Sequence, residues 1–326
     1  MNKVRLAIDV ESGDYGPQVI ISGILEARRL SDPFDAFLCG DSGNIERILA
    51  ESSVPKEILS TFTIINCPDK VSLDNKRSGA WKKHADSSII KCVQLQKEGR
   101  ADASVSAGDT AVLMGAALFL LGRSDGASRP ALAAFLPTIK KKPVLLLDVG
   151  ANLNCRAEHL VSFALLGYDY VSRFYGIETP AVGLLNIGKE PMKGTRVICE
   201  AGEILKKKCK GYAGFIEGND LLSGNADVVI CDGFAGNVLL KACESVYALT
   251  ASVLESNADL LKKVKNQMTI LDPENYGAVP FLGIRGTVLK AHGGSSPRAI
   301  SNAILTAITA VQRGAVWTKN GRPKGN

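Results

Sequence analysis

A group of polar and glycine residues in the C-terminal half of the chain has the side-chain types that bind an anionic ligand. The apolar, β-branched run at residues 228–230 predicts a buried strand, and apolar residues return at helical spacing after Gly236 and Asn237. A strand, a glycine-bearing loop and a helix N-terminus offer backbone N–H groups and a positive helix end to a ligand. We therefore expect Asp232, Asn237 and Lys241 to face a small-molecule site. The same residue types would equally suit a simple turn and helix cap.

The same strand, loop and helix unit recurs along the chain, which favours a binding site over isolated caps. The predicted strand at residues 4–10 ends in a turn that contains Gly13 and Asp14, and the strand at 101–105 ends in a loop of small residues. Small residues there let backbone N–H groups approach a ligand closely. Further strands are expected at residues 34–40, 61–66, 130–137, 143–148, 181–186 and 287–291.

This alternation predicts an α/β fold, a Rossmann-like α/β/α arrangement in which helices cover both faces of a mostly parallel sheet. The chain has 326 residues, enough for a large core, and no low-complexity linker divides it. We expect one elaborated catalytic domain over residues 1–317 and a flexible tail over residues 318–326.

Two further segments have roles that the sequence leaves open. A long helix with one apolar side is predicted over residues 248–268, and such a helix would pack on a dimer partner or lie on a membrane surface. The polar and basic stretch at residues 71–88 is either a surface loop or a lid that carries Arg77, Lys82 and Lys83 towards an anionic substrate.

Composition argues against several classes of protein. The net charge of +6 is too mild and too dispersed to indicate nucleic-acid binding. The eight cysteines form no C-x-x-C pair and the three histidines lie far apart, so no metal site is expected. No signal peptide is visible before the first strand, which predicts reduced thiols in a cytoplasmic protein. The most apolar segment, residues 111–122, is too short to cross a bilayer.

The sequence lacks the motifs that several common enzyme reactions require. The segment from Gly183 to Lys189 matches the spacing of a phosphate-binding loop, but Glu190 stands where a magnesium-binding hydroxyl belongs, so nucleotide hydrolysis is rejected. No G-x-G-x-x-G follows the first strand, and no G-x-S-x-G marks a serine nucleophile. Cys231 has no histidine nearby in sequence and is interpreted as a small buried residue. What remains suits direct transfer involving a phosphate-bearing group, catalysed by positioning and charge stabilisation.

Taken together, the loops resemble those of the phosphate acyltransferases of bacterial phospholipid synthesis, the PlsX family. The resemblance extends from the first strand to the last helix, and several blocks in one order are more specific than any single motif. The matching blocks include ADASVSAGDT at Ala101, LLLDVGAN at Leu145, VGLLNIG at Val182, DVVICDGFAGNVLLK at Asp227 and KAHGGSS at Lys290.

The resemblance implies that a fatty acyl group is transferred from acyl carrier protein to inorganic phosphate, giving an acyl phosphate for a membrane-bound glycerol-3-phosphate acyltransferase. It also implies a fold related to those of phosphotransacetylases and isocitrate dehydrogenases, a homodimer, and no cofactor. A cytoplasmic enzyme that is peripheral to the inner face of the membrane would fit this role.

By the same resemblance, Lys193 in a Lys-Gly turn and Asn237 in a Gly-Asn turn are identified as catalytic residues. Lys193 is expected to offset phosphate charge, and Asn237 to donate to the thioester carbonyl oxygen as it becomes negative. Ser106, Gly108 and Thr110 are expected to contact phosphate. The other predicted substrate-binding residues are Asp9, Gly13, Asp14, Asp109, Asp148, Asn152, Asn186, Asp232, Gly236 and His292.

The chain departs from the family pattern in places. The first loop reads Asp-Val-Glu-Ser-Gly-Asp from Asp9, where Asp-Ala-Met-Gly-Gly-Asp is usual, and Asp109 replaces an asparagine. An added acid near a phosphate site is unfavourable unless it is paired or points away. Two other functions therefore stay open. One is a phosphotransacetylase-like enzyme that uses a short acyl-coenzyme A, and the other is an inactive lipid-synthesis scaffold.

Overall fold

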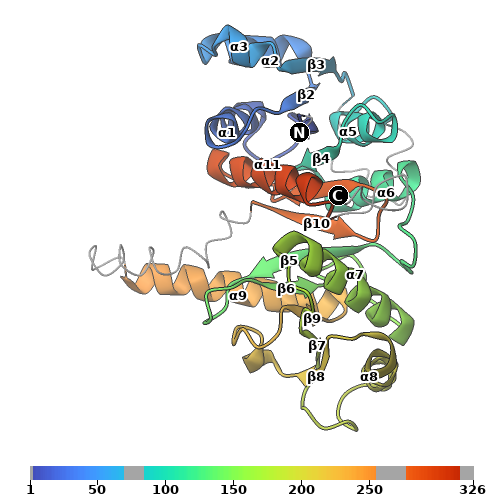
Figure 1. Ribbon diagram of the computed structural model, residues 1–326. Coiled ribbons are helices and arrows are strands. Elements are labelled where there is room, and N and C mark those ends of the chain that lie inside the picture. The colour runs from blue at the N-terminus through green and yellow to red at the C-terminus, as the bar shows by residue number, and fades with distance from the viewer. Residues whose placement is uncertain (1–2, 70–83, 255–276, 316–326) are drawn as a thin grey trace. The chain divides into compact units, whose positions relative to one another are not determined.

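The computed structural model describes residues 3–69, 84–254 and 277–315 (Figure 1). Its contacts divide the chain into two compact units, one formed by Met1–Asp125 with Tyr276–Asn326 and the other by Gly126–Asn275. The first unit is thus assembled from both ends of the chain. A single catalytic domain over residues 1–317 stays a prediction. The predicted tail and the three basic residues of the predicted lid lie outside the described residues.

The first unit contains a mostly parallel sheet with the strand order β3-β2-β1-β4-β11-β10. All neighbouring strands in it are parallel except β10, which runs antiparallel to β11. The carboxyl ends of β1, β4 and β11 therefore lie at one edge. The strands are β1 (Arg5–Asp9), β2 (Asp35–Gly40), β3 (Phe62–Asn66), β4 (Ala103–Ser106), β10 (Ala278–Leu282) and β11 (Thr287–Ala291).

The helices of the first unit bury apolar faces around this sheet. In α1 (Pro17–Leu30) the buried residues recur at helical spacing, and α1 packs against α11 (Pro297–Gln312). The two helices pack closely at Gly23, where an added Cβ would stand 2.6 Å from the Cβ of Ile300. The other helices are α2 (Ser42–Glu51), α3 (Lys56–Leu59), α5 (Ser88–Lys97) and α6 (Thr110–Leu120).

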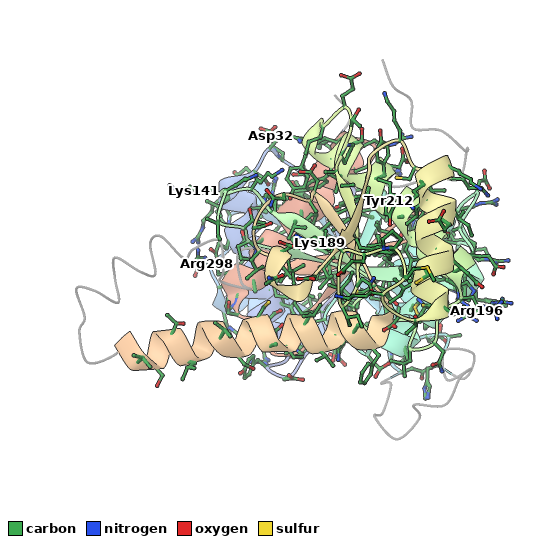
Figure 2. The ribbon with its side chains drawn as sticks, turned by 90° about the horizontal axis from the view of Figure 1, so that it is seen from below. Asp32, Lys141, Lys189, Arg196, Tyr212 and Arg298 are labelled. Atoms are coloured by element: carbon green, nitrogen blue, oxygen red, sulfur yellow. The ribbon has the colours of Figure 1, made fainter. Side chains whose placement is uncertain are left out.

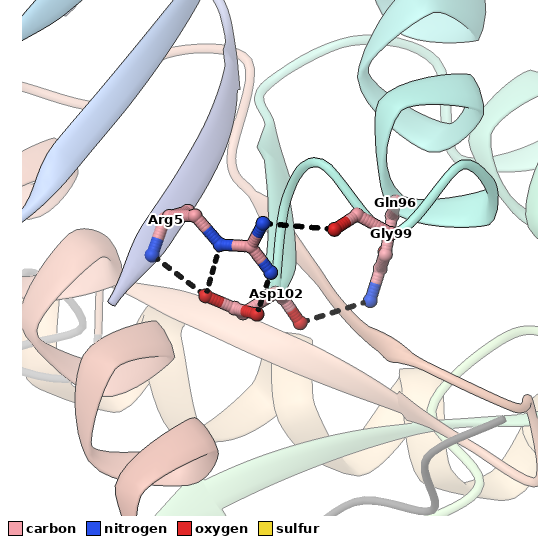
Figure 3. Close-up of polar contacts among 4 residues, drawn as sticks. All are labelled: Arg5, Gln96, Gly99 and Asp102. Carbon is pink, nitrogen blue, oxygen red and sulfur yellow. Dashed lines mark hydrogen bonds and ion pairs between the residues drawn. The ribbon is translucent and has the colours of Figure 1, made fainter. Parts of the chain in front are cut away.

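At the amino-terminal edge of this sheet, Arg5 ties β1 to the segment before β4 (Figure 3). The Arg5 guanidinium donates to both carboxylate oxygens of Asp102, at 3.2 and 2.7 Å, and to the carbonyl oxygen of Gly99 at 2.8 Å. Gln96 Nε2 donates to the carbonyl oxygen of Asp102 at 3.2 Å. A bidentate arginine–carboxylate pair fixes geometry as well as charge, so it holds the start of β4 in register with β1.

The second unit contains a sheet with the order β5-β6-β9-β7-β8. β5 and β6 are antiparallel, and the pairs β6–β9, β9–β7 and β7–β8 are parallel. The strands are β5 (Ala131–Leu136), β6 (Val144–Leu147), β7 (Val182–Leu185), β8 (Tyr212–Ile216) and β9 (Val228–Ile230). The helices are α7 (Ala157–Tyr175), α8 (Arg196–Lys208) and α9 (Gly233–Leu254), with a short 3₁₀ turn, η2 (Gly218–Asp220).

These sheets confirm the predicted α/β class and a parallel-rich arrangement. Two details of the prediction are wrong. α9 begins at Gly233, so Gly236 and Asn237 lie inside the helix rather than before it, and no new helix starts at Ala248 because α9 runs through that position to Leu254 (Figure 2). Gly236 is there for close packing: an added Cβ would come within 1.9 Å of the carbonyl oxygen of Asp148. The rest of the helix predicted to Met268 lies outside the described residues.

Candidate active site

The carboxyl ends of β1 and β4 bring Asp9 and Ser106 into contact in the first unit. The Ser106 hydroxyl donates to Asp9 Oδ2 at 2.5 Å and accepts a hydrogen bond from the Gly108 N–H at 3.0 Å. Asp9 Oδ1 accepts from the Ser12 N–H at 3.2 Å. Asp9 and Ser106 are each only 1% exposed. Their hydrogen-bonding groups are therefore used within the loops, so this pair shapes the two loops that it joins.

Asp109 caps the helix that follows β4. Its Oδ1 accepts from the N–H groups of Ala111 and Val112, at 2.9 and 3.0 Å, and Thr110 begins α6. The carboxylate thus stands where a bound anion would meet this helix end. Gly108 has no room for a side chain, because an added Cβ would stand 2.3 Å from Ile89 Cδ1.

The first and last loops of the unit also meet. Gly13 has a φ of 122°, which favours glycine, and the N–H of the next residue, Asp14, donates to the carbonyl oxygen of Gly293 at 2.8 Å. His292 is exposed, and its Nδ1 accepts from the Gly294 N–H at 3.1 Å. The predicted residues Gly13, Asp14 and His292 are therefore neighbours, and His292 supports the turn of its own loop.

Sequence reasoning missed one residue at this edge, Lys290. It lies in β11 opposite Ser106 in the parallel register with β4. Its Nζ donates to the carbonyl oxygen of Ala107 at 3.4 Å and to that of Ala291. Burial lowers the pKa of Lys290 to about 8, while the charges of Asp109, Asp14 and Asp9 act in the opposite direction. The available signal was a lone charged residue in a short, mostly apolar strand.

In the second unit, Asp148 and Asn152 organise the loop after β6. The Asp148 carboxylate accepts from the backbone N–H groups of Leu132 and Ala151, at 2.9 and 3.2 Å. It also accepts from Asn152, at 2.6 Å from the backbone N–H and 2.9 Å from Nδ2. Burial raises the pKa of Asp148, and these hydrogen bonds oppose the shift. The side chains of both predicted residues are thus engaged in hydrogen bonds within the loop and to β5.

The loop after β9 meets this one at the start of α9. Asp232 Oδ1 accepts from the Ala235 N–H, and the Gly233 N–H donates to the Asn152 carbonyl oxygen, each at 2.8 Å. An added Cβ on Gly150 would stand 3.7 Å from Asn237 Oδ1, so the exposed Asn237 side chain lies beside that loop. These contacts cap the first N–H groups of α9, and the predicted ligand site at this segment stays a prediction. Lys241 pairs with Glu244 of its own helix at 2.8 Å.

The loop after β7 carries Lys193 and is held by Asn186. Asn186 Nδ2 donates to the Lys193 carbonyl oxygen at 2.8 Å, and its Oδ1 accepts from the Ile187 N–H at 2.9 Å. Gly194 has a φ of 101°, and an added Cβ there would stand 2.1 Å from Asn186 Oδ1. The Lys193 ammonium lies 2.8 Å from Glu190 Oε1, and this hydrogen bond raises the pKa of Lys193 and lowers that of Glu190.

The predicted residues therefore gather at the carboxyl ends of strands within each unit. Asp148, Asn186 and Asp232 follow β6, β7 and β9, which are parallel neighbours in the order β6-β9-β7. Among residues 3–69, 84–254 and 277–315, no group of three or more His, Cys, Asp or Glu side chains is placed to hold a metal ion. No helix in those ranges is long and apolar enough to cross a membrane.

A cavity of about 240 Å³ lies elsewhere in the first unit. It is at the amino-terminal ends of β4 and β11, beside the contacts drawn in Figure 3. No predicted site residue lines it. Its lining includes Gln96, Lys97, Asp102, Leu121, Arg285 and Val311.

Solved structures with the same fold include phosphotransacetylases. The phosphotransacetylase from Streptococcus pyogenes superposes with a TM-score of 0.66 at 17% identity, covering 95% of this chain and 94% of that chain. The EutD phosphotransacetylase from Staphylococcus aureus gives a TM-score of 0.64 at 15% identity, with the same coverage. The chain is thus an α/β protein with the phosphotransacetylase fold, as the resemblance predicted. The predicted relation to isocitrate dehydrogenases stays a prediction.

The sequence comparisons identify the family to which the chain belongs. Residues 4–317 match the family described as fatty acid synthesis protein. The phosphate acyltransferase of Wolinella succinogenes is 38% identical over 324 residues, 95% of each chain, and that of Aliarcobacter butzleri is 39% identical over 318 residues, 94% of this chain and 93% of its own. The chain belongs to this fatty acid synthesis family, and it is an acyltransferase.

Proposed function

We propose that this acyltransferase transfers a fatty acyl group from acyl carrier protein to inorganic phosphate, giving an acyl phosphate for phospholipid synthesis. The observation that carries the proposal is the match, over nearly the whole chain, to enzymes named phosphate acyltransferase. The geometry supports it because Lys193 places a cation on a loop whose backbone is held by two hydrogen bonds of the Asn186 side chain. Phosphate itself would be the nucleophile, so the site needs no covalent intermediate.

The proposed reaction balances without another reactant. A phosphate oxygen attacks the thioester carbonyl carbon, the new C–O bond forms, and the C–S bond breaks with its electron pair on sulfur. The proton of the hydrogen phosphate ends on that sulfur as the free thiol. Lys193 would offset the phosphate charge, and Asn237 Nδ2 would donate to the carbonyl oxygen as it becomes negative. Phosphate would displace Glu190, because an ion pair between two exposed side chains is weak.

In the first unit, the proposed phosphate contacts divide into two kinds. The Ser106 hydroxyl donates to Asp9 and the Gly108 N–H donates to Ser106, so these two would act by holding the loop. Thr110 begins α6, where its N–H has no intrahelical acceptor, and it would contact phosphate directly.

The decisive experiment measures phosphate-dependent release of free thiol from long-chain acyl carrier protein, with acetyl-coenzyme A as the parallel substrate. Release from the long-chain donor alone is the expected result. Release from acetyl-coenzyme A alone would replace the proposal with a phosphotransacetylase. Release from neither donor would favour the inactive scaffold.

We further propose a homodimer that forms through α9. Phe234, Val238, Val246, Leu249 and Val253 are between 52% and 68% exposed, and their spacing places them on one side of the helix. Such an apolar stripe is typical of an interface. Contact of the same stripe with the inner membrane surface, near a membrane acyltransferase, is the alternative that a vesicle-binding test separates.

A further inference from the structure

The first unit contains a lysine, Lys290, whose ammonium group has, among the described residues, acceptors for only some of its N–H donors and no ion-pair partner. Lys290 lies between Leu289 and Ala291, both fully buried, near the carboxyl end of β11. An ammonium group has three N–H donors. Two of them point to the carbonyl oxygens of Ala107 and Ala291. In the part of the chain that the structure describes, the third has no acceptor, and no carboxylate forms an ion pair with Lys290.

The surrounding carboxylates act on Lys290 through their charge rather than by contact. They are Asp9 at the end of β1, Asp14 in the first loop and Asp109 at the cap of α6. Asp9 is already bound by Ser106 and Ser12, and Asp109 by the N–H groups of α6. A partly buried ammonium without a directly paired anion is costly, so a ligand that brings negative charge into contact with it would be favoured.

We infer that Lys290 binds the substrate phosphate, with its third N–H as a charged donor beside the loop from Ser106 to Thr110. This inference rests on the proposed function and adds a residue to it. The position supports it in two ways. The parallel register sets Lys290 opposite Ser106, and its ammonium contacts Ala107 within the predicted phosphate loop. A charge-assisted hydrogen bond to phosphate would supply the missing anion.

The structure also predicts a proton change on binding. Because the pKa of Lys290 is about 8 without a ligand, part of this lysine is neutral at pH 8. A bound phosphate dianion favours the charged ammonium and raises that pKa, so binding at pH 8 should take up a fraction of a proton. A lysine that merely supports the loop would show no such uptake.

The test compares Lys290→Met and Lys290→Arg with Lys3→Met, a lysine-to-methionine change at the opposite end of the same sheet, where Lys3 lies 3.9 Å from Asp35. The expected KM for phosphate rises about tenfold in Lys290→Met, a loss typical of a charged hydrogen bond. The KM for the acyl donor should stay unchanged, and Lys290→Arg should keep most of the phosphate affinity. An unchanged KM for phosphate in a folded Lys290→Met would overturn the inference.

Calorimetry with inorganic phosphate, in buffers of different ionisation enthalpy at pH 8, decides the case even if Lys290→Met does not fold. Wild type should take up protons on binding phosphate, and Lys290→Arg should not, because arginine stays charged at this pH. Equal uptake by both proteins, or none by wild type, would contradict the role of Lys290. Failure of the proposed function is separate, since wild type would then release no thiol with either donor.

Discussion

At the scale of single residues, Asp109 shows how a charge change can leave the local geometry intact. The family pattern has asparagine there, and asparagine and aspartate are equally good helix caps. In this chain the Asp109 carboxylate accepts from Ala111 and Val112, and one oxygen serves both bonds. Aspartate at this position therefore adds a negative charge beside the proposed phosphate loop. Its Oδ1 still caps the helix, as the Oδ1 of an asparagine would.

Asp109→Asn should lower the KM for phosphate several-fold, roughly what removal of one nearby like charge gives, and leave kcat nearly unchanged. Steady-state kinetics with varied phosphate checks this. Asp109→Ala is the control, because it removes the charge and also the cap, so it should cost about 1 kcal/mol of stability. A KM for phosphate in Asp109→Asn equal to or above that of wild type would show that this carboxylate does not oppose phosphate.

Lys193→Ala and Asn237→Ala should each reduce kcat/KM for acyl transfer by about tenfold or more, because each removes a group that stabilises transition-state charge. The control is Lys189→Ala, which removes a second cation from the loop between β7 and α8; Lys189 is labelled in Figure 2. Lys189 pairs with Asp220 at 2.9 Å rather than with Glu190. Circular dichroism should show all three variants folded. Near-normal turnover in Lys193→Ala would remove it from the site.

At the scale of elements, the conformation of the loop between β7 and α8 depends on the close packing of Gly194 against the side-chain amide of Asn186. Gly194 has a φ of 101° and no Cβ, which would overlap Asn186, and Asn186 Nδ2 donates to the Lys193 carbonyl oxygen at 2.8 Å. The fixed backbone of this loop would then determine the direction of the Lys193 side chain. We propose that Asn186 acts as a positioning residue for this loop, and its predicted part in substrate binding stays a prediction.

Gly194→Ala should reduce kcat by about tenfold, since small displacements of positioned groups have large effects on rate. Gly214→Ala is a matched control: Gly214 has the same φ of 101°, but an added Cβ would meet nothing within 4 Å. Both variants carry the strain of a positive φ, and only Gly194→Ala adds the clash with Asn186, so its melting temperature should fall further than that of Gly214→Ala. The kinetic loss should belong to Gly194→Ala alone, and equal losses in both would show that strain, not the Asn186 contact, is responsible.

The sequence predicted most elements because their apolar runs end at polar turns, as at residues 228–230 and 287–291, whose bounds the structure confirms. It missed β8 and β10. β8 is only partly buried and contains Gly214, and β10 contains Pro280, so neither shows a clear strand pattern. The site groups were predictable as loop residues at strand ends. Sequence could not show that Asp148 and Asn152 bond each other, nor that Lys290 faces a loop distant in sequence.

At the scale of the whole molecule, the proposed dimer would cover the apolar stripe of α9. Val246→Glu combined with Leu249→Glu should convert a dimer into a monomer, because charges on both copies would be buried together. Light scattering measures the mass. Ile139→Glu is the control, since Ile139 is 84% exposed and lies outside α9. A dimer that persists in the double variant, or a wild type that is monomeric but binds vesicles, would contradict the proposed interface.

The assembly of the first unit from both ends of the chain has a consequence for synthesis on the ribosome. β11 lies between β4 and β10 in that sheet, yet it is translated after every strand of the second unit. Until β11 emerges from the ribosome, the nascent chain exposes the unpaired edge of β4, to which another strand could pair incorrectly. A premature stop codon just before residue 287 would thus leave all strands of the second unit encoded, but deprive the first unit of the strand that completes its middle and carries Lys290.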